Sequence, residues 1–208
     1  MQLSKIRKSF SSILDSFLDK VQKHPQKTFL IFEENSYTYS QADKESNKVA
    51  RALWTHAQLK EGDTAALLLG NEPQLVWVWL ALAKLGCVAS VLNSNIRSKS
   101  LLHCFSCCEA KVLIVGAGKL EAFIVYQSSD VEGIDSLSDK FEKASDQPLS
   151  PQLRANINLK SPAVYIYTSG TTGNQPALST FDLVILWCLL YAVALNHTGK
   201  ASNGSFIF

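Results

Sequence analysis

The chain lacks the features that mark several large classes of protein. Its net charge is only +2 at pH 7, which gives no reason to expect a nucleic acid partner. Residues 1–10 contain no apolar stretch of the kind found at the centre of a signal peptide, so we expect no signal peptide. The longest apolar run, residues 183–195, is shorter than the about 20 residues that a membrane-spanning helix needs. This run could form a core helix, an interfacial helix or a marginal membrane segment.

Cysteines are few and odd in number. A disulfide framework pairs its cysteines, so five of them fit reduced cytosolic thiols better. The rest of the composition is ordinary, because 47% apolar and 18% charged residues describe a globular core rather than a disordered chain. A length of 208 residues fits one domain or slightly more.

Basic residues gather in the first part of the chain, where only Asp15 and Asp19 oppose them before residue 28. Such a segment could form the solvated face of a helix or rest on an anionic membrane surface. The basic residues are Lys5, Arg7, Lys8, Lys20, Lys23 and Lys27.

The N-terminal pattern predicts a helix, a hairpin and a second helix. Apolar residues repeat with a period of 3.6 over residues 9–23, which is typical of an amphipathic helix. Two short strand-like runs, residues 28–32 and 36–39, predict a hairpin. Ser40 is then expected to cap a helix, with Asp43 three residues on as a weak capping box. The inner face of that helix is expected to contain Ala42, Val49, Ala50, Leu53 and Ala57.

The middle of the chain alternates strands and helices. This spacing predicts βαβ units and a mostly parallel sheet, hence an α/β fold. Residues 128–162 are polar and rich in proline, so we expect an irregular surface connection before the sheet resumes at residue 163. The expected strands are residues 64–69, 87–92 and 111–115, and the expected helices are 74–85, 98–108 and 117–127.

One stretch has the composition of a ligand site. An apolar run over residues 163–167, which predicts a buried strand, leads directly into Thr168-Ser169-Gly170-Thr171-Thr172-Gly173. Glycine lets the backbone approach a ligand closely, and successive free N–H groups can form a nest for an anion. The hydroxyls of this segment add further donors for phosphate oxygens. A simple surface turn is the alternative interpretation.

A second stretch has the residue types of a metal site. His103, Cys104, Cys107 and Cys108 are spaced like one half of a zinc site, but no second Cys/His pair lies nearby to complete four ligands. On a helix the three cysteines lie close to one face, where cysteine packs as a small apolar residue. We therefore expect core packing and no metal site.

The glycine-rich stretch resembles the phosphate loop of the adenylate-forming enzymes, the acyl-CoA synthetase and luciferase superfamily. That loop reads as an aromatic residue or Thr, then T-S-G-T-T-G, then a variable residue, Pro and Lys. The match is complete from Tyr167 through Gly173, after which Asn174-Gln175-Pro176-Ala177 stands in place of the variable residue, Pro and Lys. No lysine follows until Lys200.

Further short sequence motifs extend the resemblance over roughly residues 10–173. They are similar to those of the very-long-chain acyl-CoA synthetases, also called fatty acid transport proteins. The resemblance implies the large N-terminal domain of that fold, present here only in part. Residues 1–176 would form a partial AMP-binding domain, and residues 177–208 a divergent apolar tail. The motifs include Lys84-Leu85-Gly86-Cys87, Asn93-Ser94-Asn95-Ile96-Arg97 and His103-Cys104-Phe105.

The family implies an ATP-dependent fatty acid–CoA ligase that forms an acyl-adenylate before CoA displaces AMP. ATP, Mg²⁺ and CoA are the implied cofactors, although the CoA site would lie outside this chain. No catalytic residue and no metal ligand is identified, because the family's later motifs have no counterpart here. We therefore expect the chain alone not to complete catalysis. The residues expected to bind ATP are Tyr167, Thr168, Ser169, Gly170, Thr171, Thr172 and Gly173.

The resemblance also implies partners and a location. A long-chain fatty acid is the expected substrate, and a membrane surface and a homo-oligomer are further options. The expected location is the cytosolic face of the endoplasmic reticulum or plasma membrane, in fatty acid uptake and activation. The alternative is a non-catalytic, truncated form that binds lipid or a protein partner.

Overall fold

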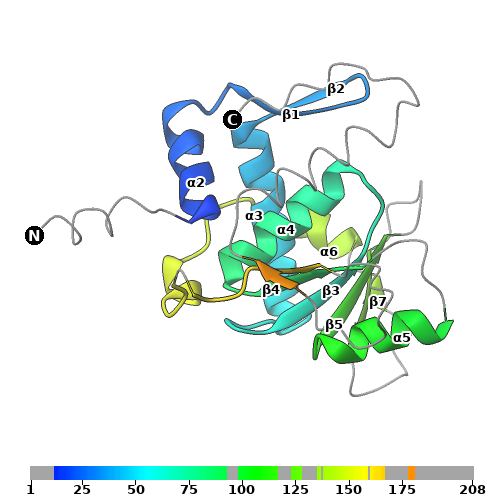
Figure 1. Cartoon of the computed structure of the whole chain (residues 1–208). Helices are drawn as coiled ribbons and strands as arrows, with labels where there is room; N and C mark the ends of the chain where they lie inside the picture. The colour runs from blue at the N-terminus through cyan, green and yellow to red at the C-terminus, as the bar shows by residue number, and fades with distance from the viewer. Residues whose placement is uncertain are drawn as a thin grey trace, which may run out of the picture.

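The computed structural model describes residues 12–92, 98–116, 123–127, 135–136, 138–158, 160–166 and 178–180 (Figure 1). Within these residues, a seven-stranded sheet has helices on both faces, and a two-stranded hairpin stands apart from it. The α/β fold class expected from the sequence is confirmed.

Helix α2 (Ile13–Lys23) is the first element of the described chain. Ser12 caps it, because the Ser12 hydroxyl accepts a hydrogen bond from the Asp15 N–H at 3.1 Å. The Asp15 carboxylate in turn accepts from the Ser12 N–H at 3.2 Å, which completes a capping box. Leu14 and Phe17 are buried on the inner face of the helix. The predicted amphipathic helix is confirmed over its described part.

The predicted hairpin and the helix after it are also confirmed. Strands β1 (Thr28–Phe32) and β2 (Asn35–Thr38) pair antiparallel, and α3 (Tyr39–Thr55) follows β2 directly. Every residue predicted for the inner face of α3 is buried: Ala42, Val49, Ala50, Leu53 and, just past the helix end, Ala57.

The predicted start of α3 is wrong. Thr38, not Ser40, is the N-cap, and Gln41 takes the place predicted for Asp43. The Thr38 hydroxyl accepts from the Gln41 N–H at 3.2 Å, and the Gln41 side chain accepts from the Thr38 N–H at 2.8 Å. Thr38 ends β2 with an extended backbone, which is the conformation an N-cap needs, whereas Ser40 already lies inside the helix.

The predicted alternation of strands and helices is confirmed through β5. Helix α4 begins with Pro73, whose missing N–H costs nothing in a first turn. It ends at Gly86, which adopts the left-handed conformation (φ +70°) that favours glycine. The elements are β3 (Thr64–Leu68), α4 (Pro73–Leu85), β4 (Val88–Val91), α5 (Ser98–Cys107) and β5 (Val112–Gly116).

The predicted helix over residues 117–127 is wrong in its second half. Residues 123–127 form strand β6 (Phe123–Gln127), which pairs antiparallel with β5. Phe123, Ile124, Val125 and Tyr126 are aromatic or β-branched, and such residues favour strands when a neighbouring strand is available. The first half of the predicted helix, residues 117–122, lies outside the described residues.

The connection predicted to be irregular contains regular structure. It includes β7 (Asp135–Ser136), α6 (Ser138–Lys143) and the 3₁₀ helix η1 (Pro151–Arg154). Phe141 of α6 is buried in the main core. These elements are too short to produce a periodic sequence pattern. Their packing against the rest of the domain therefore determines their secondary structure.

The sheet is parallel only at its centre. Its strand order is β7-β6-β5-β3-β4-β8-β9, with β8 at Val164–Ile166 and β9 at Leu178–Thr180. Strands β5, β3, β4 and β8 run parallel. The outer pairs β6–β5, β7–β6 and β9–β8 are antiparallel. The prediction of a mostly parallel sheet therefore holds for the βαβ part and misses the edges.

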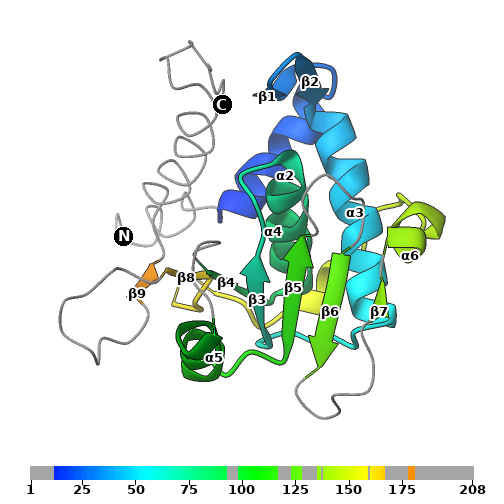
Figure 2. The same cartoon turned by 90° about the vertical axis from the view of Figure 1, so that its right-hand side faces the viewer.

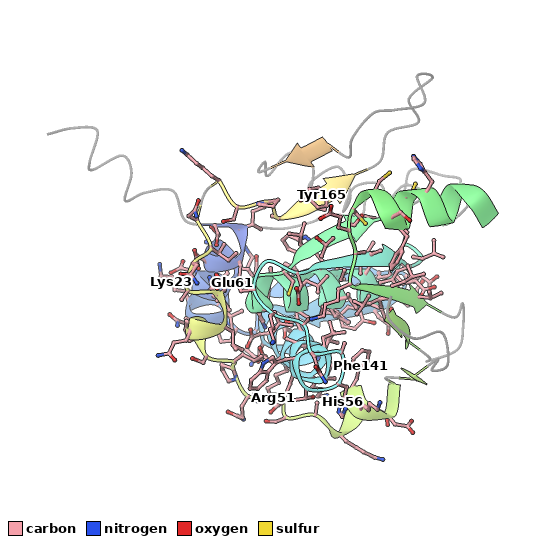
Figure 3. All side chains as sticks on the ribbon, turned by 90° about the horizontal axis from the view of Figure 1, so that it is seen from below. Lys23, Arg51, His56, Glu61, Phe141 and Tyr165 are labelled. Carbon is pink, nitrogen blue, oxygen red and sulfur yellow. The ribbon has the colours of Figure 1, made fainter. Side chains whose placement is uncertain are left out.

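Each face of the sheet has its own apolar cluster. Successive strand residues point to opposite faces, so Leu67 packs in the main cluster with α4, and Ala66 in the smaller cluster with α5. Seen from below, α5 lies on one side of the sheet, and α3 and α6 lie on the other (Figure 3). The half-buried Tyr165 of β8 packs on the α5 side with Cys104 and Phe105.

Candidate functional site

Strands β8 and β9 bracket the glycine-rich stretch. They pair antiparallel, with Ile166 opposite Leu178 and Val164 opposite Thr180. Residues 167–177 join the two strands and contain every residue predicted to bind ATP, from Tyr167 to Gly173. These residues lie outside the described part of the chain, so their predicted role stays a prediction. The two ends of the joining segment are held side by side by the strand pair.

The strand pair opens at the edge where ligands bind in sheets of this type. Leu67, Val91 and Ile166 lie level across β3, β4 and β8, so these parallel strands end together. In open α/β sheets, ligands bind in the crevice outside the carboxyl ends of the strands. Figure 2 shows β3 and β5 running in the same direction towards this edge. The segment after Ile166 therefore leaves the sheet where a phosphate site is expected.

Helix α3 holds the connection that leads to β8. The Asn47 side chain donates to the Asp146 carbonyl at 2.9 Å, and Arg51 donates to the Gln147 carbonyl at 2.9 Å. Both bonds join residues almost a hundred positions apart, so no local pattern predicts them. They pair with backbone carbonyls of a segment that has no strand or helix partner there.

Two further contacts fix the same connection closer to β8. Arg154 lies 3.2 Å from the Asp15 carboxylate, and Asn156 donates to Glu61 from both its backbone N–H (2.7 Å) and its side chain (2.9 Å). Burial acts to raise the pKa of Asp15, but the bonds from Ser12 and the charge of Arg154 outweigh it and hold that pKa below its usual value. The path into β8 is thus tied to α2 and to the turn before β3.

Lys84 is a buried cation that was not predicted from the sequence. Lys84 stands in the otherwise apolar helix α4, and its side chain is only 6% exposed. Its ammonium donates to Asp43 Oδ1 (2.8 Å), Ser46 Oγ (2.6 Å) and Asn47 Oδ1 (2.7 Å), all on α3. Burial lowers the pKa of Lys84, and the Asp43 carboxylate opposes that shift. The sequence feature that could have indicated this buried cation is a single lysine within an otherwise apolar helix.

The Lys84 cluster is structural. An ammonium has three N–H donors, and the three side-chain oxygens together with the Asp43 carbonyl at 3.1 Å use all of them. The cluster ties α4 to α3 on the face of the sheet opposite α5, and Asn47 extends it to the connection that leads into β8. It therefore holds α3 and α4 together, and its donors are all used within the protein.

The cysteine stretch on α5 behaves as predicted at two of its three thiols. Cys108 is buried, and Cys104 is half-buried against the sheet. The prediction is wrong for Cys107, which is exposed. In the part of the chain that the structure covers, no group of three or more His, Cys, Asp or Glu residues is placed to hold a metal ion.

Among the helices of the described residues, none combines the length and the apolar character that crossing a bilayer requires. The apolar run at residues 183–195 lies outside the described residues.

Comparison with known sequences identifies a family and several relatives. Residues 17–176 match the family model for AMP-binding enzymes. The long-chain fatty acid transport protein 2 of Rattus norvegicus is 44% identical over 196 residues, which cover 87% of this chain and 32% of the relative. The chain thus spans about a third of the length of this relative.

Comparison with solved structures supports the same fold. The N-terminal domain of FACL13 from Mycobacterium tuberculosis, solved with an inhibitor, matches 82% of this chain and 44% of its own with a TM-score of 0.67 and 21% identity. The anthranilate CoA ligase AuaEII, in complex with anthranoyl-AMP, matches 82% of this chain and 34% of its own with a TM-score of 0.67 and 22% identity. At these identities the likeness concerns the fold alone.

Proposed function

The chain belongs to the family of AMP-binding enzymes, and from that premise we propose that residues 168–173 bind the phosphates of ATP during activation of a long-chain or very-long-chain fatty acid. The whole enzyme of this kind is an ATP-dependent fatty acid–CoA ligase, of which this chain represents the N-terminal part. The proposal on substrate is supported by 44% identity to a long-chain fatty acid transport protein.

One observation carries the proposal. Strands β8 and β9 pair antiparallel at the carboxyl edge of the parallel strands, and the segment joining them contains Thr168-Ser169-Gly170-Thr171-Thr172-Gly173. A segment of Gly, Ser and Thr offers backbone N–H groups without bulky side chains, together with hydroxyl donors. The strands that flank it meet at the edge where α/β sheets bind ligands.

The proposed chemistry divides into two steps. The fatty acid carboxylate attacks the α-phosphorus of ATP, and the bond to the leaving pyrophosphate breaks, which yields an acyl-adenylate. The thiol of CoA then attacks the acyl carbon and AMP leaves. The segment at residues 168–173 contributes electrostatically, since its donors hold the β- and γ-phosphates while charge builds on the pyrophosphate.

Two cofactors of the family have no assigned site here. Mg²⁺ supplies charge neutralisation at the same phosphate oxygens when it is bound. Within the described residues, however, no three candidate ligands come together, so no metal position is assigned. We assign no residue to CoA.

The departure after Gly173 limits what we propose for this chain alone. Asn174-Gln175-Pro176-Ala177 replaces the variable residue, Pro and Lys, so the loop lacks its cation. We therefore expect no burst of pyrophosphate when the purified chain is mixed with ATP, Mg²⁺ and a long-chain fatty acid. A burst that is stoichiometric with the protein would contradict this expectation.

Restoring the cation tests the phosphate site itself. Ala177→Lys places a lysine directly after Pro176, one residue further from Gly173 than in the family pattern. We expect isothermal titration to show tighter binding of ATP by this variant than by the unaltered chain. Gln152→Lys is the matched control for added charge, because Gln152 is exposed in η1 and remote in sequence from the loop. Equal affinities for all three proteins would count against the site.

The second candidate function is a non-catalytic one. The break in the family pattern at Asn174 favours it, because a phosphate loop without its lysine is poorly suited to stabilise a leaving pyrophosphate. Such a form would bind lipid or a protein partner. Binding of a fatty acid without any binding of ATP would favour this candidate, whereas binding of ATP favours the first.

Location and partners are part of the same proposal. We infer association with the cytosolic face of the endoplasmic reticulum or plasma membrane, where long-chain fatty acids partition, and we keep a homo-oligomer as an option. Sedimentation with phospholipid vesicles tests the first inference. Recovery of the protein in the supernatant at every vesicle concentration would contradict it.

A further inference from the structure

Helix α5 carries a cluster of thiols that the proposed function does not use. Cys107, on its last turn, is exposed, and its sulfur lies 3.5 Å and 3.7 Å from the two ring nitrogens of His103. His103 is exposed as well. An imidazole at this distance can accept the thiol proton, and the thiolate is the reactive form of cysteine. Cys107 thus combines access to solvent with a nearby base.

A second thiol lies one helical turn before Cys107. Because Cβ atoms at this spacing are about 5–6 Å apart in a regular helix, a bond between the two thiols requires the last turn of α5 to adjust. Cα atoms three residues apart on an α-helix are separated by about 5 Å, which falls in the range that a disulfide bridges. Cys104 occupies that position. Burial, followed by the proximity of Cys107 and Cys108, raises the pKa of the Cys104 thiol, so Cys104 is the slower nucleophile of the pair.

The other described cysteines are unsuited to react first. Cys108 is buried, and its thiol donates to the Phe105 carbonyl at 3.3 Å. Cys87 is buried at the start of β4, where its thiol donates to the Lys60 carbonyl at 3.1 Å. Burial raises the pKa of Cys87 to about 12, which leaves almost no thiolate at neutral pH. The structure therefore ranks Cys107 first.

We propose that Cys107 and Cys104 form a dithiol modification site that reacts with small-molecule disulfides, with His103 accepting the proton of Cys107. In the first step, the Cys107 thiolate attacks one sulfur of the disulfide, and the other half leaves as a thiolate that takes up the proton. In the second step, Cys104 loses its proton to solvent and attacks the sulfur of Cys107, which releases the second half. Two protein thiols become one disulfide, and one small disulfide becomes two thiols.

The new bond has a structural consequence. Cys104, like Phe105 and Tyr165, packs against the smaller buried cluster on the α5 side of the sheet. Bonding to Cys107, which is exposed, would draw the Cys104 sulfur away from this cluster. The proposal does not depend on binding of ATP by the loop after Tyr165, so each can fail without the other.

Peptide mass spectrometry after treatment with oxidised glutathione tests the proposal. A Cys188→Ser background leaves only thiols whose positions are described. We expect Cys107 to gain glutathione first, and then a disulfide between Cys104 and Cys107 to replace the adduct while Cys87 stays unmodified. In a Cys104→Ser variant the glutathione adduct on Cys107 should persist. Equal modification of Cys87 and Cys107, or an adduct that never resolves when Cys104 is present, would overturn the proposal.

The role of His103 needs its own measurement, because a change on the helix surface could act through folding. His103→Ala should slow adduct formation at Cys107 severalfold in neutral buffer while far-ultraviolet circular dichroism stays unchanged. The difference should disappear at high pH, where the thiol ionises without a base. An unchanged rate in neutral buffer would remove His103 from the site.

Discussion

Replacing Lys84 tests whether the buried ammonium holds helices α3 and α4 together. Lys84→Met keeps most of the aliphatic length of the side chain and removes the charge. It leaves the Asp43 carboxylate and the Asn47 amide oxygen without their main donor, since Lys84 lies 2.8 Å and 2.7 Å from them. Ser46 keeps a partner, because its hydroxyl donates to the Ala42 carbonyl at 2.7 Å.

The magnitude follows from what is left unpaired. Removing one partner of a buried ion pair costs about 3–5 kcal/mol, because the remaining charge has lost both water and its counter-ion. Asp43 is 13% exposed and still accepts from Asn47 at 3.1 Å, so we expect the lower end, about 3 kcal/mol. Small domains have a total stability of about 5–15 kcal/mol, so the loss is easily measured.

Urea denaturation followed by tryptophan fluorescence measures the loss. The matched control is Lys23→Met, which breaks an ion pair of the same 2.8 Å length with Asp19, but on an exposed surface. We expect no measurable shift of the midpoint there, because water and salt screen exposed pairs. The double variant Lys84→Met with Asp43→Leu should recover part of the loss. Equal effects of Lys84→Met and Lys23→Met would refute the reasoning.

Three further predictions concern a cap, a glycine and a carboxylate. Thr38→Ala should lower the free energy of unfolding, measured in urea, by about 1 kcal/mol, whereas Ser40→Ala should lower it clearly less. The reverse order would support Ser40 as the cap, as predicted from the sequence. Gly86→Ala should cost about 1–2 kcal/mol or more, since φ is +70° and a Cβ would lie 3.0 Å from that of Arg154; an unchanged stability would contradict this geometry. The pKa of Asp15 is lowered in the folded protein, so the ionised carboxylate stabilises the fold. The unaltered protein should therefore exceed Asp15→Asn in free energy of unfolding by its full margin above pH 3.8, and this margin should vanish as the pH falls through the lower pKa of the folded state. A difference between the two proteins that stays constant with pH would exclude that effect.

Elements whose signal is local were predictable from the sequence. The apolar period of α2, the turn between β1 and β2, and Gly86 at the end of α4 each depend on residues within a few positions. The expected segment boundaries agree with the structure there to within a few residues.

Elements whose partners are distant in sequence were not predictable. Residues 123–127 could pack as a helix or a strand on local preference, and the free edge of β5 decides for a strand. The Lys84 cluster and the bonds from Asn47 and Arg51 join residues 37 to 99 positions apart. No pattern in one sequence identifies those partners.

The strand before the candidate site was predictable, whereas the site itself stays a prediction. Residues Val164–Ile166 of the predicted strand form β8, whose carboxyl end lies level with that of the parallel strand β4. Strand β9 was missed, because Leu178–Thr180 has no alternating pattern long enough to mark a strand, and pairing with β8 defines it.

Titration of ATP into a pair of threonine variants tests the central claim most directly. Thr171→Val with Thr172→Val removes two hydroxyl donors from the proposed loop at nearly constant volume, and Thr55→Val removes one at the end of α3 as the control. We predict measurable binding of ATP by the unaltered chain and by Thr55→Val, and a clear loss of affinity in the loop variant. Equal affinity in all three proteins, or no binding of ATP by any of them, would contradict the account.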